Sequence, residues 1–258
     1  MIALRSLLFT ALFYLNLAGH MILFGPFVLF GPDSVIWWVT KSWARTSLWL
    51  MRVVTGTKAA IGGQENIPKG PAIIAAKHQA FWEVFALVPE LERPTFVLKK
   101  ELMAIPLFGW YSRRLGMIPV DRTKGASAMH SILGGAQTAL DAGRQIIIFP
   151  EGTRTAPGVA ADYHPGVYFL YSKLDAPLVP VALNSGVYWP RDSFVRRPGT
   201  VLAEFLPAIP PGLKRHDLIR ALKETIEGRS LDMLRQAYRE RRDLPMNDVI
   251  AELLREAA

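Results

Sequence analysis

Residues 71–83 read PAIIAAKHQAFWE, and this stretch decides the fold class. Its first six residues are a short, continuously apolar run, which predicts a strand buried on both faces. Lys77 and His78 follow at once, so His78 is expected at the carboxyl-terminal edge of that strand, where open α/β sheets place their sites. Glu83 comes five residues after His78, at the start of a predicted helix.

Similar apolar runs recur along the chain, and helical stretches separate them. Strands are predicted at residues 71–76, 95–98, 117–120, 145–149, 178–183 and 201–206. Helices are predicted at residues 82–89, 101–115, 126–142 and 165–174. Gly143 is expected to stop the helix that precedes it. This alternation predicts an α/β fold with a mainly parallel central sheet flanked by helices.

The N-terminal part has a different composition. Residues 6–30 contain no charged residue and are long enough to cross a bilayer, although Gly25-Pro26 and Gly31-Pro32 should break a helix. A cleaved signal peptide has a shorter apolar segment and a small-residue cleavage site. Residues 34–55 hold four of the seven tryptophans, interspersed with cations, as in helices of the lipid headgroup layer. We expect a hydrophobic two-helix hairpin in one leaflet, with a transmembrane anchor as the alternative.

The domain organisation follows from these changes in composition. We predict a membrane-anchoring module in residues 1–56 and an α/β domain in residues 57–258, joined near the turn-rich Gly62-Gly63. The charged segment from about residue 214 predicts one or two surface helices, with Leu244-Pro245 between them.

Charge and cysteine content narrow the classes of function. The formal net charge of +8 suits an anionic partner such as a phosphate-bearing substrate or a lipid surface. The chain has no cysteine, which excludes disulfides, thiolate catalysis and cysteine-ligated metal. It also has no zinc-finger spacing and no aromatic RNA-binding signature, so a nucleic-acid partner is not expected.

A second polar turn follows the apolar run at residues 145–149. It reads Pro150-Glu151-Gly152-Thr153-Arg154, in which Gly152 permits close backbone approach and Arg154 supplies a fork suited to phosphate. At the first strand end, the Glu83 carboxylate can orient one nitrogen of His78 and leave the other to act as a base. Taken singly, either feature also fits an ordinary surface pair.

Four blocks in order over residues 70–185 together resemble the glycerolipid acyltransferase family, in particular its 1-acyl-glycerol-3-phosphate acyltransferases. They are His78 with its acid, residues 116–122 (GMIPVDR), residues 149–154 (FPEGTR) and residues 178–184 (LVPVALN). The commonest family pattern has Asp at the position of Glu83 and often Asn at that of Lys77. The ammonium of Lys77 would disfavour protonated His78 if the two side chains approach.

The resemblance implies transfer of a fatty acyl group from an acyl thioester to the sn-2 hydroxyl of lysophosphatidic acid. His78 would be the base and Glu83 its orienting partner. The implied substrate-binding residues are Lys100, Arg122 and Arg154 for the acceptor's phosphate, Glu151 and Gly152 for its glycerol part, and Thr153 in the same turn. The resemblance implies no metal and no redox cofactor, with acyl-CoA or acyl-ACP (acyl carrier protein) as co-substrate.

Two kinds of alternative remain at this point: another acceptor, or a protein that is not an enzyme. The alternative acceptors are a lyso-ornithine lipid, glycerol 3-phosphate or another lysophospholipid, and the cationic set favours a phosphate. A non-catalytic membrane-binding protein of the same fold is the alternative from another class. The resemblance places the chain at a bacterial-type inner membrane, with the catalytic domain on the cytoplasmic face.

Overall fold

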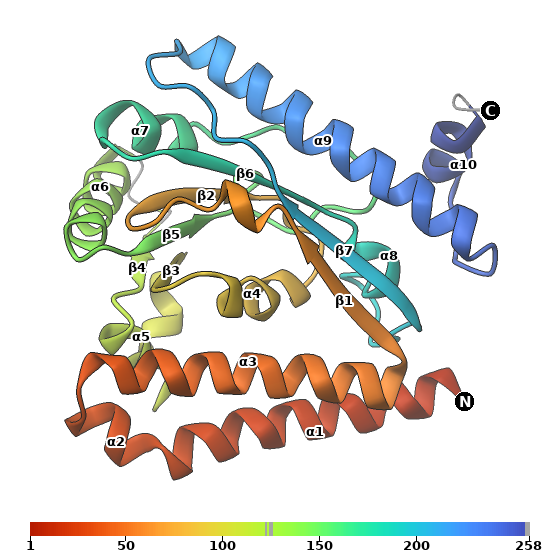
Figure 1. Cartoon of the computed structure of the whole chain (residues 1–258), viewed down its shortest axis with the longest axis horizontal. Coiled ribbons are helices and arrows are strands. Elements are labelled where there is room, and N and C mark those ends of the chain that lie inside the picture. Colours follow the sequence, from red (N-terminus) through yellow and green to blue (C-terminus); the bar gives the residue numbers. More distant parts are fainter. Residues whose placement is uncertain (122, 124–125, 256–258) are drawn as a thin grey trace.

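The computed structural model describes residues 1–121, 123 and 126–255, and within them seven strands form one sheet (Figure 1). The strand order is β1-β7-β6-β2-β5-β3-β4. The strands are β1 (Thr57–Gly62), β2 (Ala72–Ala76), β3 (Pro94–Lys99), β4 (Ile118–Val120), β5 (Gln145–Ile148), β6 (Leu178–Leu183) and β7 (Gly199–Phe205). Strands β2 to β6 run parallel, whereas β7 is antiparallel to β6 and parallel to β1. The predicted mainly parallel sheet is confirmed.

The two faces of β2 belong to two different cores, so this strand is buried throughout. Ile73 and Ala75 pack with α6 (Ala126–Asp141), α7 (Gly166–Lys173) and the first part of α9 (Arg215–Glu240). The alternate residues of β2 pack with α4 (Trp82–Ala86) and the N-terminal helices. The continuous apolar run at residues 72–76 therefore reflects helices on both sides of the sheet, as Figure 1 shows.

The structure differs from the sequence-based predictions in two elements. The predicted helix at residues 101–115 is instead a 3-10 turn η3 (Lys100–Ala104) and a short helix α5 (Phe108–Arg114). Pro106 has no N–H to continue a helix, and Leu107 has a positive φ of 61°. Strand β1 was not predicted, because it is an edge strand with exposed central residues and lacks an apolar run.

The N-terminal helices lie beneath the sheet. Helices α1 (Ile2–Leu23) and α3 (Asp33–Thr55) run antiparallel side by side, and the short α2 (Gly25–Phe30) joins them (Figure 1). The predicted break of the apolar segment near Gly25-Pro26 is confirmed. In the part of the chain that the structure describes, α1 is the single helix long and apolar enough to cross a membrane, with a mean hydropathy of 1.6.

Polar residues of α1 bind α3 rather than facing outward. The side-chain amide of Asn16 donates to Ser47 Oγ at 3.0 Å, and His20 Nε2 lies 3.4 Å from Ser42 Oγ. On the same stripe of α1, nearer its N-terminus, Phe9 and Phe13 are buried in the core that also contains β2 and α4. Helices α1 and α3 therefore form a hairpin that packs against the α/β domain.

The remaining elements are three short ones and the C-terminal helices. The short ones are the 3-10 turns η1 (Gln64–Asn66) and η2 (Val88–Glu90) and the short helix α8 (Ser185–Tyr188). Helix α9 is followed by α10 (Asp248–Arg255), with Leu244-Pro245 in the connection, in the segment for which the sequence predicts one or two C-terminal helices. Gly143 follows α6 with a φ of +71°, as expected of a helix stop.

Candidate active site

His78 lies just beyond the carboxyl end of β2, with its side chain 17% exposed. Its Nδ1 is 2.8 Å from Oε1 of Glu83. A carboxylate oxygen can only accept, so Nδ1 is the protonated nitrogen and donates to it. The lone pair is then on Nε2, which is the arrangement a general base needs.

The Glu83 carboxylate is held by four donors and is fully buried. Besides His78, its Oε1 accepts from the backbone N–H groups of Gln79 at 2.7 Å and Ala80 at 2.8 Å. Its Oε2 accepts from the hydroxyl of Ser185, the first residue of α8, at 2.7 Å. These bonds fix the carboxylate in one orientation, so the longer glutamate side chain reaches the imidazole as an aspartate would.

An aromatic ring covers one face of the imidazole. Phe149 stacks on His78 with centroids 4.0 Å apart and planes inclined by 16°. Phe96 in turn stacks on Phe149, with centroids 6.4 Å apart. The stack limits rotation of the imidazole about its side-chain bonds, so Phe149 and Glu83 together define the plane of His78.

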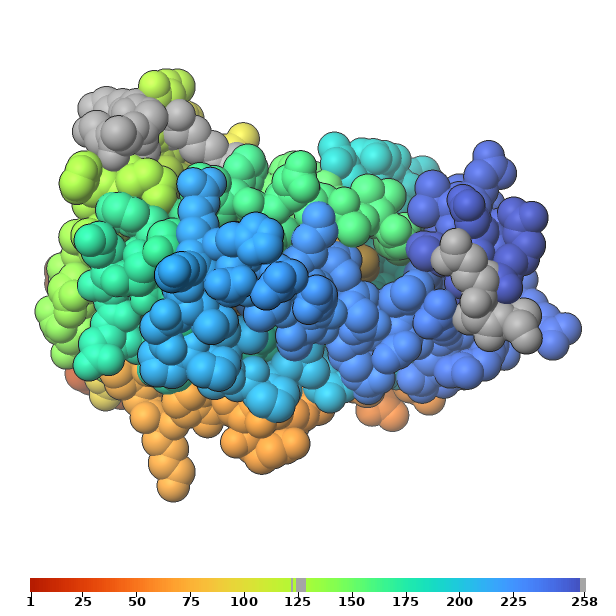
Figure 2. Space-filling model, turned by 90° about the horizontal axis from the view of Figure 1, so that it is seen from above, coloured from red at the N-terminus to blue at the C-terminus, as the bar shows by residue number. Residues whose placement is uncertain are grey.

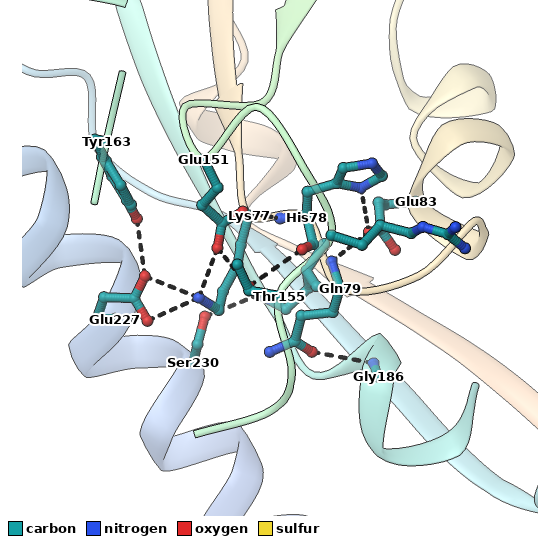
Figure 3. A network of polar contacts seen from close by, with 12 residues as sticks. Lys77, His78, Gln79, Glu83, Glu151, Thr155, Tyr163, Gly186, Glu227 and Ser230 are labelled. Atoms are coloured by element: carbon teal, nitrogen blue, oxygen red, sulfur yellow. Dashed lines mark hydrogen bonds and ion pairs between the residues drawn. The ribbon is translucent and has the colours of Figure 1, made fainter. Parts of the chain in front are cut away.

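Glu151 is buried behind His78 and binds its backbone. Oε2 of Glu151 accepts from the His78 N–H at 2.6 Å, while Oε1 accepts from Lys77 Nζ at 3.0 Å and from the Thr155 hydroxyl at 2.8 Å (Figure 3). Burial raises the pKa of the Glu151 carboxyl, and the ammonium of Lys77 opposes that shift. Both carboxylate oxygens are therefore used within the protein, on the far side of the His78 backbone from the imidazole.

The rest of the turn after β5 lies beside His78. The Thr155 N–H donates to the His78 carbonyl at 2.8 Å. Gly152 has a φ of +65°, and a Cβ there would lie 2.5 Å from Cδ2 of His164, so glycine is required. Thr153 and Arg154 are exposed at the surface of this turn.

Two of the three expected phosphate ligands, Lys100 and Arg154, follow strands that end at the same sheet edge. Lys100 follows β3, is 61% exposed, and forms an ion pair of 3.7 Å with Asp121 after β4. Strand β5 lies between β2 and β3, so Lys100 and His78 are separated along that edge by the turn after β5. Arg122 lies outside the described residues. The structure thus brings His78, Glu83 and the 151–154 turn together and places Lys100 to one side.

Sequence reasoning missed several residues of the site. Thr155 and Ser185 directly follow the third and fourth blocks, so their positions in the chain offered a signal. Glu227, on α9, offered none, because it is one acid among many in a charged helix. Lys77 does not approach the imidazole, because its ammonium is bound by Glu151 and Glu227.

A metal site is not evident in this region. Within residues 1–121, 123 and 126–255, no three His, Asp or Glu side chains are grouped as they would be around a metal ion. The expectation that the reaction needs no metal or redox cofactor stays a prediction.

Comparison with known proteins shows the family of this chain. The profile of the Acyltransferase family matches residues 58–184. A 1-acyl-sn-glycerol-3-phosphate acyltransferase of Pseudomonas aeruginosa is 35% identical over 205 residues, which are 78% of this chain and 80% of that protein. This chain belongs to the 1-acyl-sn-glycerol-3-phosphate acyltransferase family. A member from Saccharomyces cerevisiae is 27% identical over 77% of this chain and 66% of its own length.

The fold of this acyltransferase also occurs in a solved structure. The crystal structure of the 1-acyl-sn-glycerophosphate (LPA) acyltransferase PlsC from Thermotoga maritima matches with a TM-score of 0.77 at 21% identity. The match covers 90% of this chain and 98% of that one. The family profile spans β1 to the end of β6, so it includes His78 and the turn after β5 but excludes α9.

Proposed function

We propose that this acyltransferase moves a fatty acyl group from an acyl thioester to the sn-2 hydroxyl of lysophosphatidic acid, forming phosphatidic acid. The observation that supports it most directly is the geometry of His78, whose Nδ1 is held by the buried Glu83 at 2.8 Å. An imidazole fixed in this way can accept a proton at Nε2, and the nearby carboxylate stabilises the imidazolium that forms.

In the proposed reaction, Nε2 of His78 takes the proton of the acceptor hydroxyl while the hydroxyl oxygen attacks the thioester carbonyl carbon. The new C–O bond gives a tetrahedral oxyanion. Its collapse breaks the C–S bond, and the leaving thiolate takes the proton from the imidazolium. His78 returns to its starting state, so this sequence balances without a metal or redox partner. Acyl-CoA and acyl carrier protein both present the thioester that the reaction needs.

The acceptor is proposed to carry a phosphate because two exposed cations follow strands that end at the same sheet edge as the strand before His78. Arg154 is exposed on the turn that contacts the His78 backbone, and Lys100 is exposed at the end of β3. We assign Arg122 to this group from the family motif alone. Gly152 and Thr153 lie in the same turn and are proposed to contact the glycerol. For Glu151, whose oxygens bind Lys77 and His78, we propose a positioning role.

The N-terminal hairpin is proposed to enter the cytoplasmic leaflet of a bacterial-type inner membrane. Soluble proteins rarely expose large contiguous apolar patches. Helices α1 to α3 expose many large apolar side chains, namely Leu4, Leu7, Leu8, Tyr14, Leu15, Ile22, Leu23, Phe27, Phe30, Trp38, Trp49 and Val53. Both the acceptor and the product are bilayer lipids, so a membrane-embedded hairpin beside the catalytic domain would shorten their path to His78.

The test is an acylation assay with purified protein in lipid vesicles. Wild-type protein is expected to acylate lysophosphatidic acid in preference to lyso-ornithine lipid. Acyl-CoA and acyl-ACP are compared as donors. His78→Ala should lower kcat by at least about a hundredfold, because the general base is removed. The control is His130→Ala, since His130 is exposed on α6. Near-normal turnover by His78→Ala would overturn the mechanism, and preference for lyso-ornithine lipid would overturn the acceptor.

A further inference from the structure

Lys77 is a charged residue in the interior, with only 1% of its side chain exposed. Its ammonium lies 2.8 Å from each carboxylate oxygen of Glu227 and 3.0 Å from Oε1 of Glu151. A buried ammonium is tolerated only where it is paired and hydrogen-bonded, and these two carboxylates meet that requirement. Lys77 therefore joins α9, which contains Glu227, to the turn after β5, which contains Glu151.

The turn after β5, to which Lys77 is joined through Glu151, also binds the backbone of His78. Glu151 accepts the His78 N–H at 2.6 Å, and the Thr155 N–H donates to the His78 carbonyl at 2.8 Å. Thr155 also donates its hydroxyl to Glu151 at 2.8 Å. Figure 3 shows the Lys77 and His78 side chains on opposite sides of the chain, so the network holds the backbone without touching the imidazole.

Glu227 is also bound by Tyr163, which lies in the connection between β5 and α7. The Tyr163 hydroxyl donates to its Oε1 at 3.0 Å. Burial and the nearby carboxylates raise the pKa of the Tyr163 phenol, so Tyr163 stays an O–H donor. Helix α9 is fixed against β6, because the Leu183 N–H donates to Ser230 Oγ at 3.2 Å and Asn184 donates to the Met233 carbonyl at 3.1 Å.

A cavity beside the ion pairs gives the Lys77 side chain room to move. A cavity of about 140 Å³ lies against Lys77 and Glu227, with Gly158 and Leu253 among its other lining residues. Figure 2 shows this face of the molecule, where α9 and α10 lie beside the loop that follows β5. If Glu227 lost its charge, Lys77 would keep one charged partner and could turn into the cavity, leaving Glu151 without its cation.

We propose that Glu227 is a positioning residue for acyl transfer, acting through Lys77 and Glu151 on the backbone of His78. The inference rests on the proposed function for its kinetic consequence. It extends the site to α9, outside the segment that matches the family profile. A displacement of the base by a fraction of an ångström lowers the rate of the chemical step while leaving substrate binding intact.

The test compares Glu227→Gln with Glu224→Gln, since Glu224 lies exposed on the same helix one turn earlier. Glu227→Gln is expected to lower kcat by about tenfold to a hundredfold, with KM for both substrates within about twofold of wild type. Glu224→Gln should match wild type in both. A folded Glu227→Gln protein with unchanged kcat, or with an equal loss through KM alone, would overturn the proposal.

A second readout does not depend on the substrate. Diethyl pyrocarbonate modifies accessible imidazole, and peptide mass spectrometry reports the rate at His78. Glu227→Gln should be labelled at His78 about threefold faster than wild type, because local opening is easier. An unchanged labelling rate at His78 would contradict the role proposed for Glu227, whatever the acylation assay shows. If wild-type protein fails to acylate lysophosphatidic acid, that result overturns the proposed function alone.

A gentler variant covers the case in which Glu227→Gln does not fold. Tyr163→Phe removes only the hydroxyl that binds Glu227 and keeps the buried ring. It should lower kcat by about twofold to fivefold at unchanged KM and speed labelling of His78. A Tyr163→Phe protein identical to wild type in kcat and in labelling would contradict the proposal.

Discussion

The ring of Phe149 lies flat against the imidazole of His78, with centroids 4.0 Å apart and planes inclined by 16°. Phe149 directly follows β5, and His78 follows the neighbouring strand β2. Two adjacent parallel strands thus deliver an aromatic ring and the proposed base to the same point. The stack and the hydrogen bond to Glu83 act on the imidazole at right angles to one another, because one presses on its face and the other holds its edge.

Phe149→Leu is expected to lower kcat by about tenfold, because leucine fills the space but leaves the imidazole free to tilt. The thermal midpoint should fall little, since the side chain is only partly buried. The matched control is Phe169→Leu on α7, where the ring contacts the exposed His130 instead. Equal kcat values for Phe149→Leu and wild type would show that the stack does not position His78.

Gly152→Ala is expected to destabilise the turn by about 1–2 kcal/mol from its positive φ alone, with a further cost from the clash with His164. The double variant Gly152→Ala/His164→Ala should recover the part due to the clash but not the part due to φ. Thermal unfolding of the two variants and of His164→Ala measures both parts. No recovery in the double variant would contradict the assigned contact.

Lys77→Met should destabilise the protein by about 3–5 kcal/mol, because Glu151 and Glu227 would lose the cation between them. This loss of stability should also be larger at higher pH. Burial raises the pKa of Glu151 from its ordinary value of 4.5, so the folded state binds more protons than the unfolded state above that pH. Stability then falls as pH rises toward the folded pKa.

Removing Lys77 removes a charge that opposes this shift, so the pKa of Glu151 should rise further and the loss should extend to higher pH. Thermal midpoints at about pH 5 and about pH 8 should therefore differ more between Lys77→Met and wild type at the higher pH. The double variant Lys77→Met/Glu151→Gln is the control, in which this part of the pH dependence should vanish. A gap independent of pH would contradict the assignment.

Replacing two outward tryptophans of α3 tests the membrane face. Trp38 and Trp49 are 57% and 59% exposed. The double variant Trp38→Asp/Trp49→Asp should bind anionic lipid vesicles at least about tenfold more weakly, because each indole contributes to interfacial binding. Val249→Asp, an exposed apolar position on α10, is the control and should leave flotation with vesicles unchanged. Equal binding by all three proteins would place the lipid contact elsewhere.

Much of the sheet was predictable because its strands are continuously apolar. The run at residues 178–183 was predicted with the bounds that β6 has, since both of its faces are buried. Strand β1 was missed because its middle residues are exposed and only its pairing with β7 makes it a strand. The helix predicted over residues 101–115 was wrong because Pro106 outweighs the apolar spacing around it.

The site was predictable where neighbours in sequence are also neighbours in space. His78 and Glu83 are five residues apart in a tight turn, so their contact needed only local geometry. The contact of Ser185 with Glu83 spans 102 residues, and that of Lys77 with Glu227 spans 150. Residue type and spacing carry no information about such pairs when each member alone resembles an ordinary surface residue.

The amino-acid sequence by itself determined the α/β class, the position of His78 at a strand end and the pairing of His78 with Glu83. Each follows from hydrophobic periodicity or from a short loop, both of which act over a few residues. Only the tertiary structure decided which face each polar group occupies. It directs Lys77 toward α9 and His78 toward α4, because successive residues at a strand end point to opposite faces and a helix far along the chain supplies Glu227.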